Sequence, residues 1–388
     1  YFYRVRAYNS IGNSDYSNTV NETTDAEPVT VPASPDTLAV SSFSSTQIDL
    51  TWTDNSDNEE GFKIEQSTDG SVFSQIITVT ADITSFSVTG LDAETQYFYR
   101  VRAYNSIGNS DYSNTVNETT DAMPEGSFVS NHFYGTLSSL KSIPESAIEN
   151  AKTNLHIAYA HTSHGSQIPY GMLELDTFMG NTGLYDWNEG GTDGALDLDD
   201  YFVPGDLGEP DRTTWATRTR EYLDDPANSD VNVVMWSWCG QASTSIDNID
   251  IYLNLMEGLI TDYTDITFIF MTGHLDGGGL NGLLHLANEH IREHCETNNR
   301  WLYDFEDIES YDPDGNYFGD KLVNDACEYD SDGNGSLDGN WATEWQDSHT
   351  RDVDWYYCSA AHSEALNGNQ KTYAAWWLWA RLAGWDGN

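Results

Sequence analysis

A serine flanked by two histidines ends an apolar run in the segment LHIAYAHTSHGSQIPYGM, residues 155–172. Ser163 stands between His161 and His164 and is followed by Gly165. A serine hydroxyl becomes a nucleophile when an imidazole takes its proton and backbone N–H groups bind the oxyanion that forms. This segment therefore contains residue types that could carry out acyl transfer.

Three later segments carry residues that suit the same chemistry. Gly240 follows the apolar run VNVVMWSW, His274 lies in TGHLDGGG, and His362 lies in CSAAHSEALN near the end of the chain. A glycine N–H can bind an oxyanion, and a histidine can act as the base. Zinc binding through imidazole and carboxylate ligands is a competing hypothesis, and its candidates are His161, His164, His274, Asp276 and His362.

A second zinc option is the pair His290 and His294 in EHIREH, four residues apart. This pair could share one face of a helix. It lacks the order HExxH that zinc hydrolases use, and Glu289 and Glu293 stand beside it. A solvated helix face is the simpler interpretation.

The elements that must position these residues alternate along the chain. Apolar runs typical of buried strands occupy residues 154–160, 231–238, 266–273 and 300–305. Amphipathic stretches typical of helices separate these runs. This pattern predicts an α/β domain of three layers, with a parallel sheet covered on both faces. Active groups in such domains lie at the carboxyl ends of the strands, and Ser163, Gly240 and His274 each follow one of these runs closely.

The order of these motifs over residues 128–388 resembles the SGNH, or GDSL-like, hydrolase family. The first block of the family, a strand and then the nucleophilic serine, matches IAYAHTSHG with Ser163. Gly240 matches the glycine of the second block, and His362 matches the histidine of the last block. The resemblance implies that His362 is the base and that the N–H groups of Ser163 and Gly240 bind the oxyanion.

Three positions depart from the family pattern. Thr162 replaces the aspartate before the serine, and His274 occupies the place of an asparagine that donates to the oxyanion. We expect His274 to donate in its stead. The acid expected three residues before His362 is Ser359. Either His362 works in a dyad oriented by a backbone carbonyl, or Asp354 serves as the acid.

The resemblance implies a serine esterase that needs no cofactor for its chemistry. An exported enzyme of this kind is expected to deacylate an extracellular polysaccharide or glycoconjugate. The alternative is a surface fibre or adhesin in which a hydrolase-like head binds without catalysis. The missing acid and the missing asparagine favour this alternative, whereas the ordered serine, glycine and histidine favour the enzyme.

Two acidic loops in the insert 311–340 have the oxygen spacing of calcium sites. YDSDGNGSLDGN resembles an EF-hand or dockerin loop, with glycine at its sixth position. Trp341 replaces the usual glutamate at its twelfth position, and Glu344 or Asp347 could compensate. YDPDGNYFGD has the spacing without the glycine. The predicted calcium ligands are Asp330, Asp332, Asn334, Ser336 and Asp338 in the first loop and Asp312, Asp314, Asn316 and Asp320 in the second.

An exact repeat organises the first third of the chain: residues 1–26 recur without a change at residues 97–122. Short alternating runs over residues 32–121 predict an all-β sandwich. Trp52, Tyr97 and the YRVRAYNSIGNSDYSN segment make it resemble a fibronectin type III domain. Residues 1–26 are then expected to be the last hairpin of a preceding repeat, and the repeats could mediate self-association.

Composition restricts the partners and the location. With 16 Lys and Arg against 63 Asp and Glu, the formal net charge is −47, which opposes binding to nucleic acid and to anionic membranes. No apolar stretch is long enough to span a bilayer, so we expect no membrane insertion. Four cysteines lack zinc-site spacing, and Cys327 with Cys358 is the favoured disulfide in a secreted or cell-surface protein.

Overall fold

A computed structural model describes the chain outside a few short segments, and the chain divides into two compact units. The first unit holds most of residues 1–118, and the second contains residues 119–388. The described residues are 1–23, 30–42, 48–88, 91, 95–120, 128–205, 207–238 and 240–387.

The first unit contains the predicted β-sandwich. One sheet has the order β5-β6-β9, and the other has the order β11-β10-β7-β8 with β12 also paired to β10. Alternate side chains of β10 are buried, and Trp52 packs on Phe62 with ring centroids 5.6 Å apart. The strands are β5 Asp36–Ser42, β6 Ile48–Thr53, β7 Gly61–Ser67, β8 Ser74–Thr80, β9 Ser85–Val88, β10 Gln96–Asn105, β11 Gly108–Asn109 and β12 Val116–Thr119.

Residues 1–23 form two short antiparallel pairs, β1 Phe2–Tyr3 with β4 Val20–Asn21 and β2 Tyr8–Asn9 with β3 Gly12–Asn13. Every described residue of this segment is exposed. The hairpin is therefore held by its own hydrogen bonds and has no core of its own.

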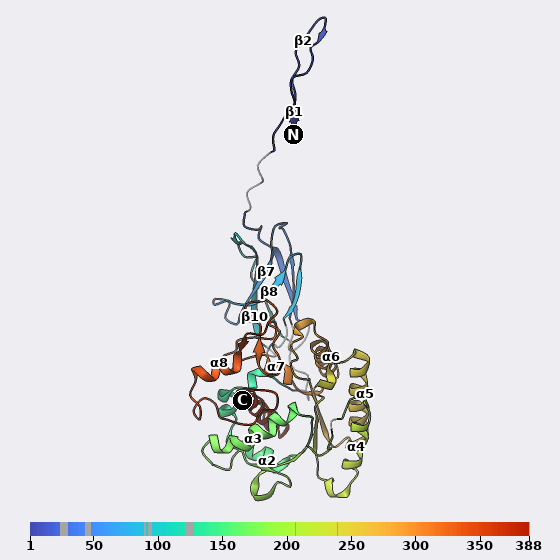
Figure 1. Ribbon diagram of the computed structural model, residues 1–388. Helices are drawn as coiled ribbons and strands as arrows, with labels where there is room; N and C mark the ends of the chain where they lie inside the picture. The colour runs from blue at the N-terminus through green and yellow to red at the C-terminus, as the bar shows by residue number, and fades with distance from the viewer. Residues whose placement is uncertain are drawn as a thin grey trace. The chain divides into compact units, whose positions relative to one another are not determined.

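The second unit is built on a parallel sheet of seven strands in the order β13-β19-β18-β17-β14-β16-β15. Figure 1 shows the helices that surround this sheet. All pairings within it are parallel, which confirms the predicted α/β class. The four predicted runs became β14, β17, β18 and β19, while three strands were not predicted. The bounds are β13 Val129–Ser130, β14 His156–Ala160, β15 Trp187–Asn188, β16 Leu196–Asp200, β17 Val233–Trp236, β18 Thr267–Met271 and β19 Trp301–Tyr303.

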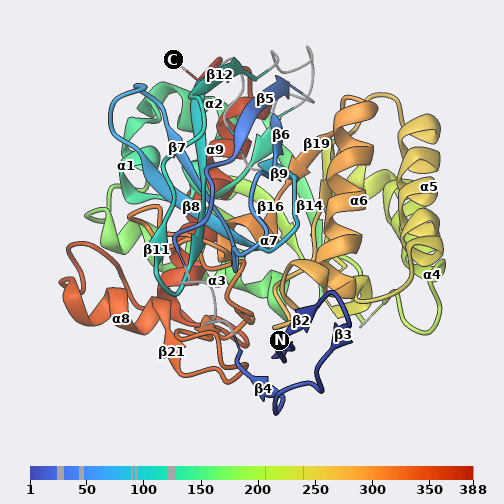
Figure 2. The same cartoon turned by 90° about the horizontal axis from the view of Figure 1, so that it is seen from above.

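Helices cover both faces of this sheet because alternate strand residues point to opposite sides. Ile157 and Tyr159 join one apolar core with α1, α2, α3 and α9, whereas Ala158 and Ala160 join a second core with α4, α5 and α6 (Figure 2). The helices are α1 Leu137–Ser142, α2 Glu145–Asn154, α3 Gln167–Phe178, α4 Thr214–Leu223, α5 Ile246–Asp262, α6 Leu283–Thr297, α7 Phe305–Glu309, α8 Trp341–Ser348 and α9 Ala365–Leu382.

The direction in which strands are added to the sheet reverses at β14 and β17. After β14 the chain adds β16 on one side and then β17, β18 and β19 on the other. Where the winding direction reverses in this way, the helices leave the sheet on opposite faces and open a ligand-binding crevice. Ser163 follows β14 and Gly240 follows β17, so both belong to the loops at this position.

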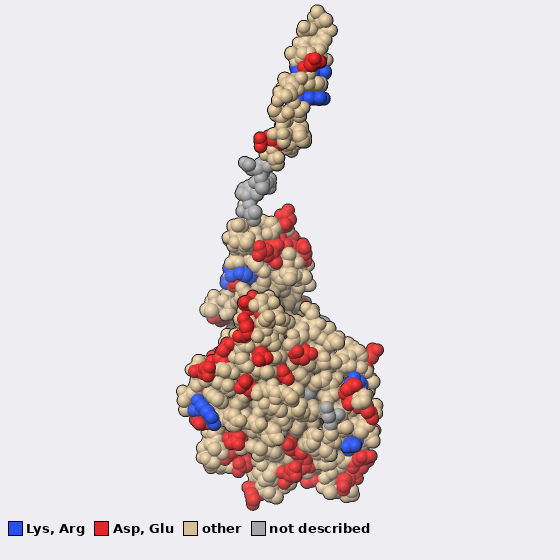
Figure 3. All heavy atoms as spheres, viewed as in Figure 1, with Lys and Arg blue, Asp and Glu red and all other residues tan. Residues whose placement is uncertain are grey.

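Among the charged side chains of the exposed surface, the acidic ones outnumber the basic ones. Figure 3 shows Asp and Glu spread over the visible face with few Lys and Arg among them. Phosphate backbones and anionic lipids would be repelled by such a surface, in agreement with the expectation from composition.

Candidate active site

Ser163 lies at the turn between β14 and the short 3₁₀ helix His164–Ser166 that leads into α3. Its side chain is exposed, and its Oγ lies 3.5 Å from Nδ1 of His164. The Ser163 carbonyl accepts a hydrogen bond of 2.6 Å from the hydroxyl of Ser166, which fixes the turn. The serine is thus presented at the sheet edge beside an imidazole, at the long limit of a hydrogen bond.

His164 is oriented by a carboxylate that the sequence did not identify. Its Nε2 lies 2.9 Å from Oδ2 of Asp325, and only 8% of the residue is exposed. Because a carboxylate accepts, the ring proton belongs on Nε2, and Nδ1 keeps a lone pair toward Ser163. Burial raises the pKa of Asp325, but the hydrogen bond from His164 and the nearby imidazoles outweigh it and hold that pKa below its usual range.

Two further histidines stack on His164. The ring of His274 lies 3.8 Å from it at an interplanar angle of 5°, and the ring of His362 lies 4.6 Å away at 20°. These rings come from the loop after β18 and the loop before α9. The fold therefore brings together three of the histidines that sequence reasoning singled out.

His274 has a defined proton position. Its Nδ1 lies 2.5 Å from the carbonyl oxygen of Leu275, which can only accept, so Nδ1 carries the proton. Burial lowers the pKa of His274, and the adjacent His164 lowers it further. A neutral ring with this tautomer has a lone pair at Nε2. The predicted role of His274 as an oxyanion donor would require the charged ring, which its pKa disfavours.

Gly240 lies close to this group. A Cβ added to Gly240 would be 3.6 Å from Nε2 of His274. Ser163 N–H makes no hydrogen bond among the residues that the structure describes. The backbone donor predicted at Ser163 is thus free to bind a ligand, and the one predicted at Gly240 stays a prediction.

His362 is exposed and has a backbone φ of 64° in the left-handed region, where histidine is found more often than most residues. Within the described part of the chain it makes no hydrogen bond to Ser163 or to Asp354. Asp354 instead accepts from the Thr350 N–H at 2.9 Å. The carboxylate in the histidine cluster is Asp325, and Asp354 is not brought to it.

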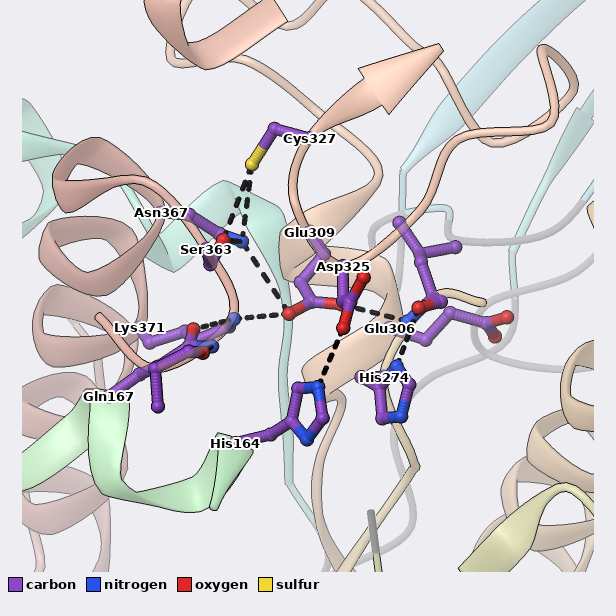
Figure 4. Close-up of polar contacts among 12 residues, drawn as sticks. His164, Gln167, His274, Glu306, Glu309, Asp325, Cys327, Ser363, Asn367 and Lys371 are labelled. Carbon is purple, nitrogen blue, oxygen red and sulfur yellow. Dashed lines mark hydrogen bonds and ion pairs between the residues drawn. The ribbon is translucent and has the colours of Figure 1, made fainter. Parts of the chain in front are cut away.

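A buried ion pair lies behind the histidines (Figure 4). Lys371 of α9 contacts both Gln167 of α3 and Glu309 of α7, and the lysine and glutamate side chains are 0% and 1% exposed. The other oxygen of Glu309 accepts from the Leu275 N–H at 2.8 Å. One ion pair thus ties the loop that carries His274 to the helices that follow His164 and His362.

The zinc set proposed from sequence is divided by the fold. His161 places Nε2 2.9 Å from Asp200 and Nδ1 2.6 Å from the Thr162 carbonyl, so both of its nitrogens are engaged. Asp276 accepts from the Gly278 N–H at 2.9 Å and from the Ser243 hydroxyl at 3.4 Å. His161 and Asp276 therefore make separate local contacts, while the other three histidines are clustered.

The helical histidines make polar contacts between helices. His290 Nε2 lies 2.8 Å from Asp250 of α5, and His294 Nε2 lies 3.0 Å from Glu257 of the same helix. Each imidazole has a different carboxylate, so α5 and α6 are joined at two points. This arrangement differs from the simple solvated face expected from sequence.

Both acidic loops of the insert fold back on their own backbones. Asp330 accepts from the N–H groups of Gly333, Asn334 and Gly335 at 2.7–3.1 Å. The hydrogen bond from the Gly335 N–H lowers the pKa of the Asp330 carboxyl. Asp312 accepts similarly from Asp314 and Asn316 at 3.0 and 2.9 Å. Calcium binding at either loop stays a prediction.

The favoured disulfide is wrong for this structure, where Cys327 and Cys358 are buried free thiols. Cys327 Sγ lies 3.5 Å from the amide nitrogen of Asn367, and Cys358 Sγ lies 3.4 Å from that of Asn369. Residues two apart on a helix face different directions, so the two sulfurs contact different faces of α9. Cys239 lies outside the described residues.

Tryptophan rings can stack on sugars, but three of those in the second unit are core residues. Trp215, Trp236 and Trp238 are each at most 1% exposed and pack in the core beside α4 and α5. Trp187 is half-buried on β15. Buried indole rings cannot meet a sugar, so these residues explain the stability of the fold better than they explain binding.

Comparison with known proteins identifies one of the two units. Residues 33–119 match the family model of the fibronectin type III domain. Contactin-6 of Mus musculus is 33% identical over 129 residues, which is 31% of this chain and 12% of the contactin. Chitinase A1 of Niallia circulans is 31% identical over 129 residues, which is 31% of this chain and 18% of the chitinase.

Two solved structures are similar to part of this chain. The crystal structure of FN3tt is 27% identical and covers 24% of this chain and 98% of that chain, with a TM-score of 0.22. The FN1–FN3 domains of chicken CNTN1 are 25% identical and cover 30% of this chain and 41% of that chain, also with a TM-score of 0.22. Residues 33–119 are thus a fibronectin type III domain by the family match. The chain spans 12% of the length of Contactin-6.

No helix in the described part of the chain combines the length and the apolar character that crossing a membrane requires.

Proposed function

We propose that residues 128–388 form a serine esterase of the SGNH type. The observation that supports this most strongly is the chain of contacts from Ser163 Oγ to His164 Nδ1 at 3.5 Å and from His164 Nε2 to Asp325 at 2.9 Å. A nucleophile, a base and an orienting carboxylate in this order are the parts that acyl transfer needs. They lie at the carboxyl edge of the sheet, where an α/β fold binds its ligands.

In the proposed reaction Ser163 Oγ attacks the ester carbonyl carbon and its proton passes to His164 Nδ1. Asp325 holds the ring in the tautomer that leaves Nδ1 free and stabilises the imidazolium. The N–H groups of Ser163 and Gly240 bind the oxyanion. The alcohol leaves with the proton from His164, and a water molecule then hydrolyses the acyl-enzyme by the same steps.

This assignment changes the base that the family resemblance implies. His362 has no described carboxylate partner in hydrogen-bond contact and no contact with Ser163 Oγ, whereas His164 has both. A 3.5 Å contact before substrate binds can shorten in the reacting complex. We therefore assign the base to His164, with Asp325 in place of Asp354 as the acid.

The proposed substrate is an acylated extracellular polysaccharide or glycoconjugate, and the proposed location is outside the cell or on its surface. The support is the fibronectin type III domain at residues 33–119, which is similar to a region of a chitinase. The similarity to Contactin-6 also fits self-association through such domains. The net charge of −47 leaves nucleic acid and anionic membranes unfavoured.

Calcium is proposed as a structural ion in the loop that begins at Asp330. The loop has oxygen ligands on alternate residues and Gly335 with a φ of 85° at its sixth position. Bound calcium would order the insert that carries Asp325. Excess EGTA is expected to lower the melting temperature and the esterase activity together, and an unchanged melting curve would remove calcium from the account.

The competing function is a binding head that does not catalyse. It is favoured by the length of the contact between Ser163 and His164, which lies at the limit of hydrogen bonding. Hydrolysis of a short-chain p-nitrophenyl ester by the full chain, measured beside Ser163→Ala, separates the two functions. Turnover that the variant loses supports the esterase. No turnover by a folded wild-type chain supports the binding head.

A further inference from the structure

The histidine cluster contains a set of metal ligands that the serine mechanism does not require. One ligand atom each from His164, Asp325 and His362 lie within 4.8 Å of one another. Two imidazoles and one carboxylate are a recurring ligand set for zinc and other divalent transition metals, with positions left open for water. The zinc hypothesis from the sequence included His164 and His362 but not Asp325, which the fold brings to them.

Their geometry is close to that of a coordination sphere. Zinc binds imidazole nitrogen at about 2.0–2.1 Å, which separates neighbouring ligands of a tetrahedral site by about 3.3 Å. Nε2 of His164 and Oδ2 of Asp325 are already 2.9 Å apart. The ligand atom of His362 lies within 4.8 Å of those of His164 and Asp325. His362 is exposed and makes no hydrogen bond to any described residue, so its ring is held only by its stacking on His164.

The surroundings limit how the other ligands can move. His164 is 8% exposed and is stacked on His274 at 3.8 Å, so its ring plane is set before any metal arrives. Asp325 is half-buried, and its partner is His164. A site with two fixed ligands and one mobile ligand can bind a metal without rebuilding the fold.

We propose that His164, Asp325 and His362 bind a divalent transition metal, with Zn²⁺ as the probe, and that this metal switches off the serine site. The binding follows from the ligands alone, and the inhibition rests on the proposed function. In the metal-free site Nε2 of His164 carries the proton and Nδ1 accepts from Ser163. For Zn²⁺ to bind Nε2, the proton that this nitrogen carried must move to Nδ1, so that the ring adopts the other neutral tautomer. Nδ1 then donates toward Ser163 Oγ and no longer accepts its proton.

The test uses the full chain after removal of metals with EDTA. Zn²⁺ uptake is measured by competition with a chromophoric chelator, and Co²⁺ substitution reports imidazole ligation through its visible absorption. Wild type and Ser163→Ala are expected to take up one ion per chain with the same affinity. His362→Ala and Asp325→Asn are expected to bind at least about 100-fold more weakly, since loss even of a supporting residue costs 10- to 100-fold.

A second histidine and carboxylate cluster serves as the matched control. His156 lies 3.2 Å from Asp199 and 3.6 Å from Asp197, and it offers only one imidazole. His156→Ala is expected to leave tight Zn²⁺ uptake unchanged. Uptake that is lost in His156→Ala and kept in His362→Ala would overturn the proposed site, as would the absence of tight uptake by wild type.

The consequences for the enzyme are measured separately with a p-nitrophenyl ester. One equivalent of Zn²⁺ is expected to lower wild-type turnover at least tenfold, and EDTA is expected to restore it. Tight uptake at His362 without inhibition would keep the metal site but overturn the switch. Turnover that depends on Ser163 without any tight uptake would keep the proposed esterase and overturn the metal site.

Discussion

The two histidines on either side of Ser163 are alike in their carboxylate contacts and differ at the other ring nitrogen. His161 lies 2.9 Å from Asp200, and His164 lies 2.9 Å from Asp325. Nδ1 of His161 faces the Thr162 carbonyl at 2.6 Å, whereas Nδ1 of His164 faces the hydroxyl of Ser163 at 3.5 Å. A paired carboxylate is therefore common to both histidines, and the position of Nδ1 beside the Ser163 hydroxyl distinguishes the candidate base.

The aromatic rings that pack against the two histidines also differ. His161 packs against Tyr159 and Tyr201 with centroids 4.7 and 5.3 Å away, and His164 stacks on two imidazoles. Tyrosine rings hold His161 as a structural residue. Imidazole neighbours give His164 a surrounding with further titratable nitrogens.

The most direct way to break this comparison is to replace each histidine with glutamine. His164→Gln removes the proton acceptor and is expected to lower kcat/KM for a p-nitrophenyl ester at least about a thousandfold. His161→Gln changes only the contacts that hold the loop after β14, so we expect kcat/KM to fall less than about a hundredfold. Steady-state kinetics of the two variants check this. Equal losses would remove the distinction between the two histidines.

The next test concerns the buried ion pair between Lys371 and Glu309, which joins the helix that follows His164 to α7 and α9. Lys371→Met leaves the buried carboxylate of Glu309 unpaired and is expected to lower the free energy of unfolding by about 3–5 kcal/mol. Urea unfolding followed by tryptophan fluorescence measures this. Every tryptophan except Trp52 lies within residues 128–388, so the signal reports mainly the second unit.

Arg220→Met is the matched control for that measurement. Its ion pair with Asp262 is 2.7 Å long, and the two side chains are 31% and 51% exposed. Exposed pairs contribute at most about 1 kcal/mol. If the two variants lost the same stability, the buried pair would not be the support that the structure indicates.

The carboxylates give a smaller contrast. Asp325→Asn keeps the shape of the residue but weakens its hold on the ring proton of His164, so we expect kcat/KM to fall about a hundredfold. Asp200→Asn makes the same change beside His161 and is expected to cost less than about tenfold. The kinetic constants of both variants provide the measurement, and a larger loss at Asp200 would reverse the assignment of the acid.

The smallest expected effect is on the pH dependence of stability. Burial and the neighbouring His164 lower the pKa of His274, while an unfolded histidine titrates near 6.5. The unfolded chain then binds more protons below about pH 6.5, so stability falls as the pH decreases through that range. His274→Asn keeps a donor for the Leu275 carbonyl but does not titrate.

Calorimetry at about pH 7.5 and about pH 5 measures the effect. The melting temperature of His274→Asn is expected to decrease by ~2–4 °C less than that of wild type. Glu309 and Asp325 also face His274 and are present in both proteins, so the difference isolates the imidazole. An equal decrease in the two proteins would contradict the lowered pKa.

Residues that repeat identically show how far sequence alone could predict the fold. Asn9 and Asn105 are equivalent positions, and each accepts from the backbone N–H two residues later at 2.9 Å. Tyr3 is nevertheless 57% exposed, while its equivalent Tyr99 is 0% exposed. The turn is set by local chemistry and is the same in both copies. Burial depends on β7, which pairs with β10 and which residues 1–23 lack among their described neighbours.

The same limit applies to the second unit. Long apolar runs predicted β14, β17 and β18, because a strand buried on both faces is apolar throughout. The strand β16, with the sequence LDLDD, was missed because its aspartates resemble a loop, although Leu196 and Leu198 are fully buried. Strands near the edge of a sheet can carry polar residues on one face, and such a pattern gives a weak signal.

The sequence predicted where the candidate site lies in the fold, but it predicted only some of the residues that form the site. Strand order brought Ser163 and His274 to one edge, as expected from their places after the strands, and the loop before α9 brings His362 to the same place. Asp325 was not predicted, because an acidic residue in an acidic insert has no distinctive neighbour in the sequence. Its role depends on how the insert folds back over the sheet edge, and this is a tertiary property.

The central claim, that Ser163 is the nucleophile, is tested most directly by covalent labelling. A fluorophosphonate reacts with an activated serine, and intact-mass and peptide analysis locates the adduct. One adduct on Ser163 in wild type, none in Ser163→Ala and much slower labelling in His164→Gln is the predicted result. A folded wild-type chain that stays unlabelled, or that is labelled at the same rate in His164→Gln, would contradict the account.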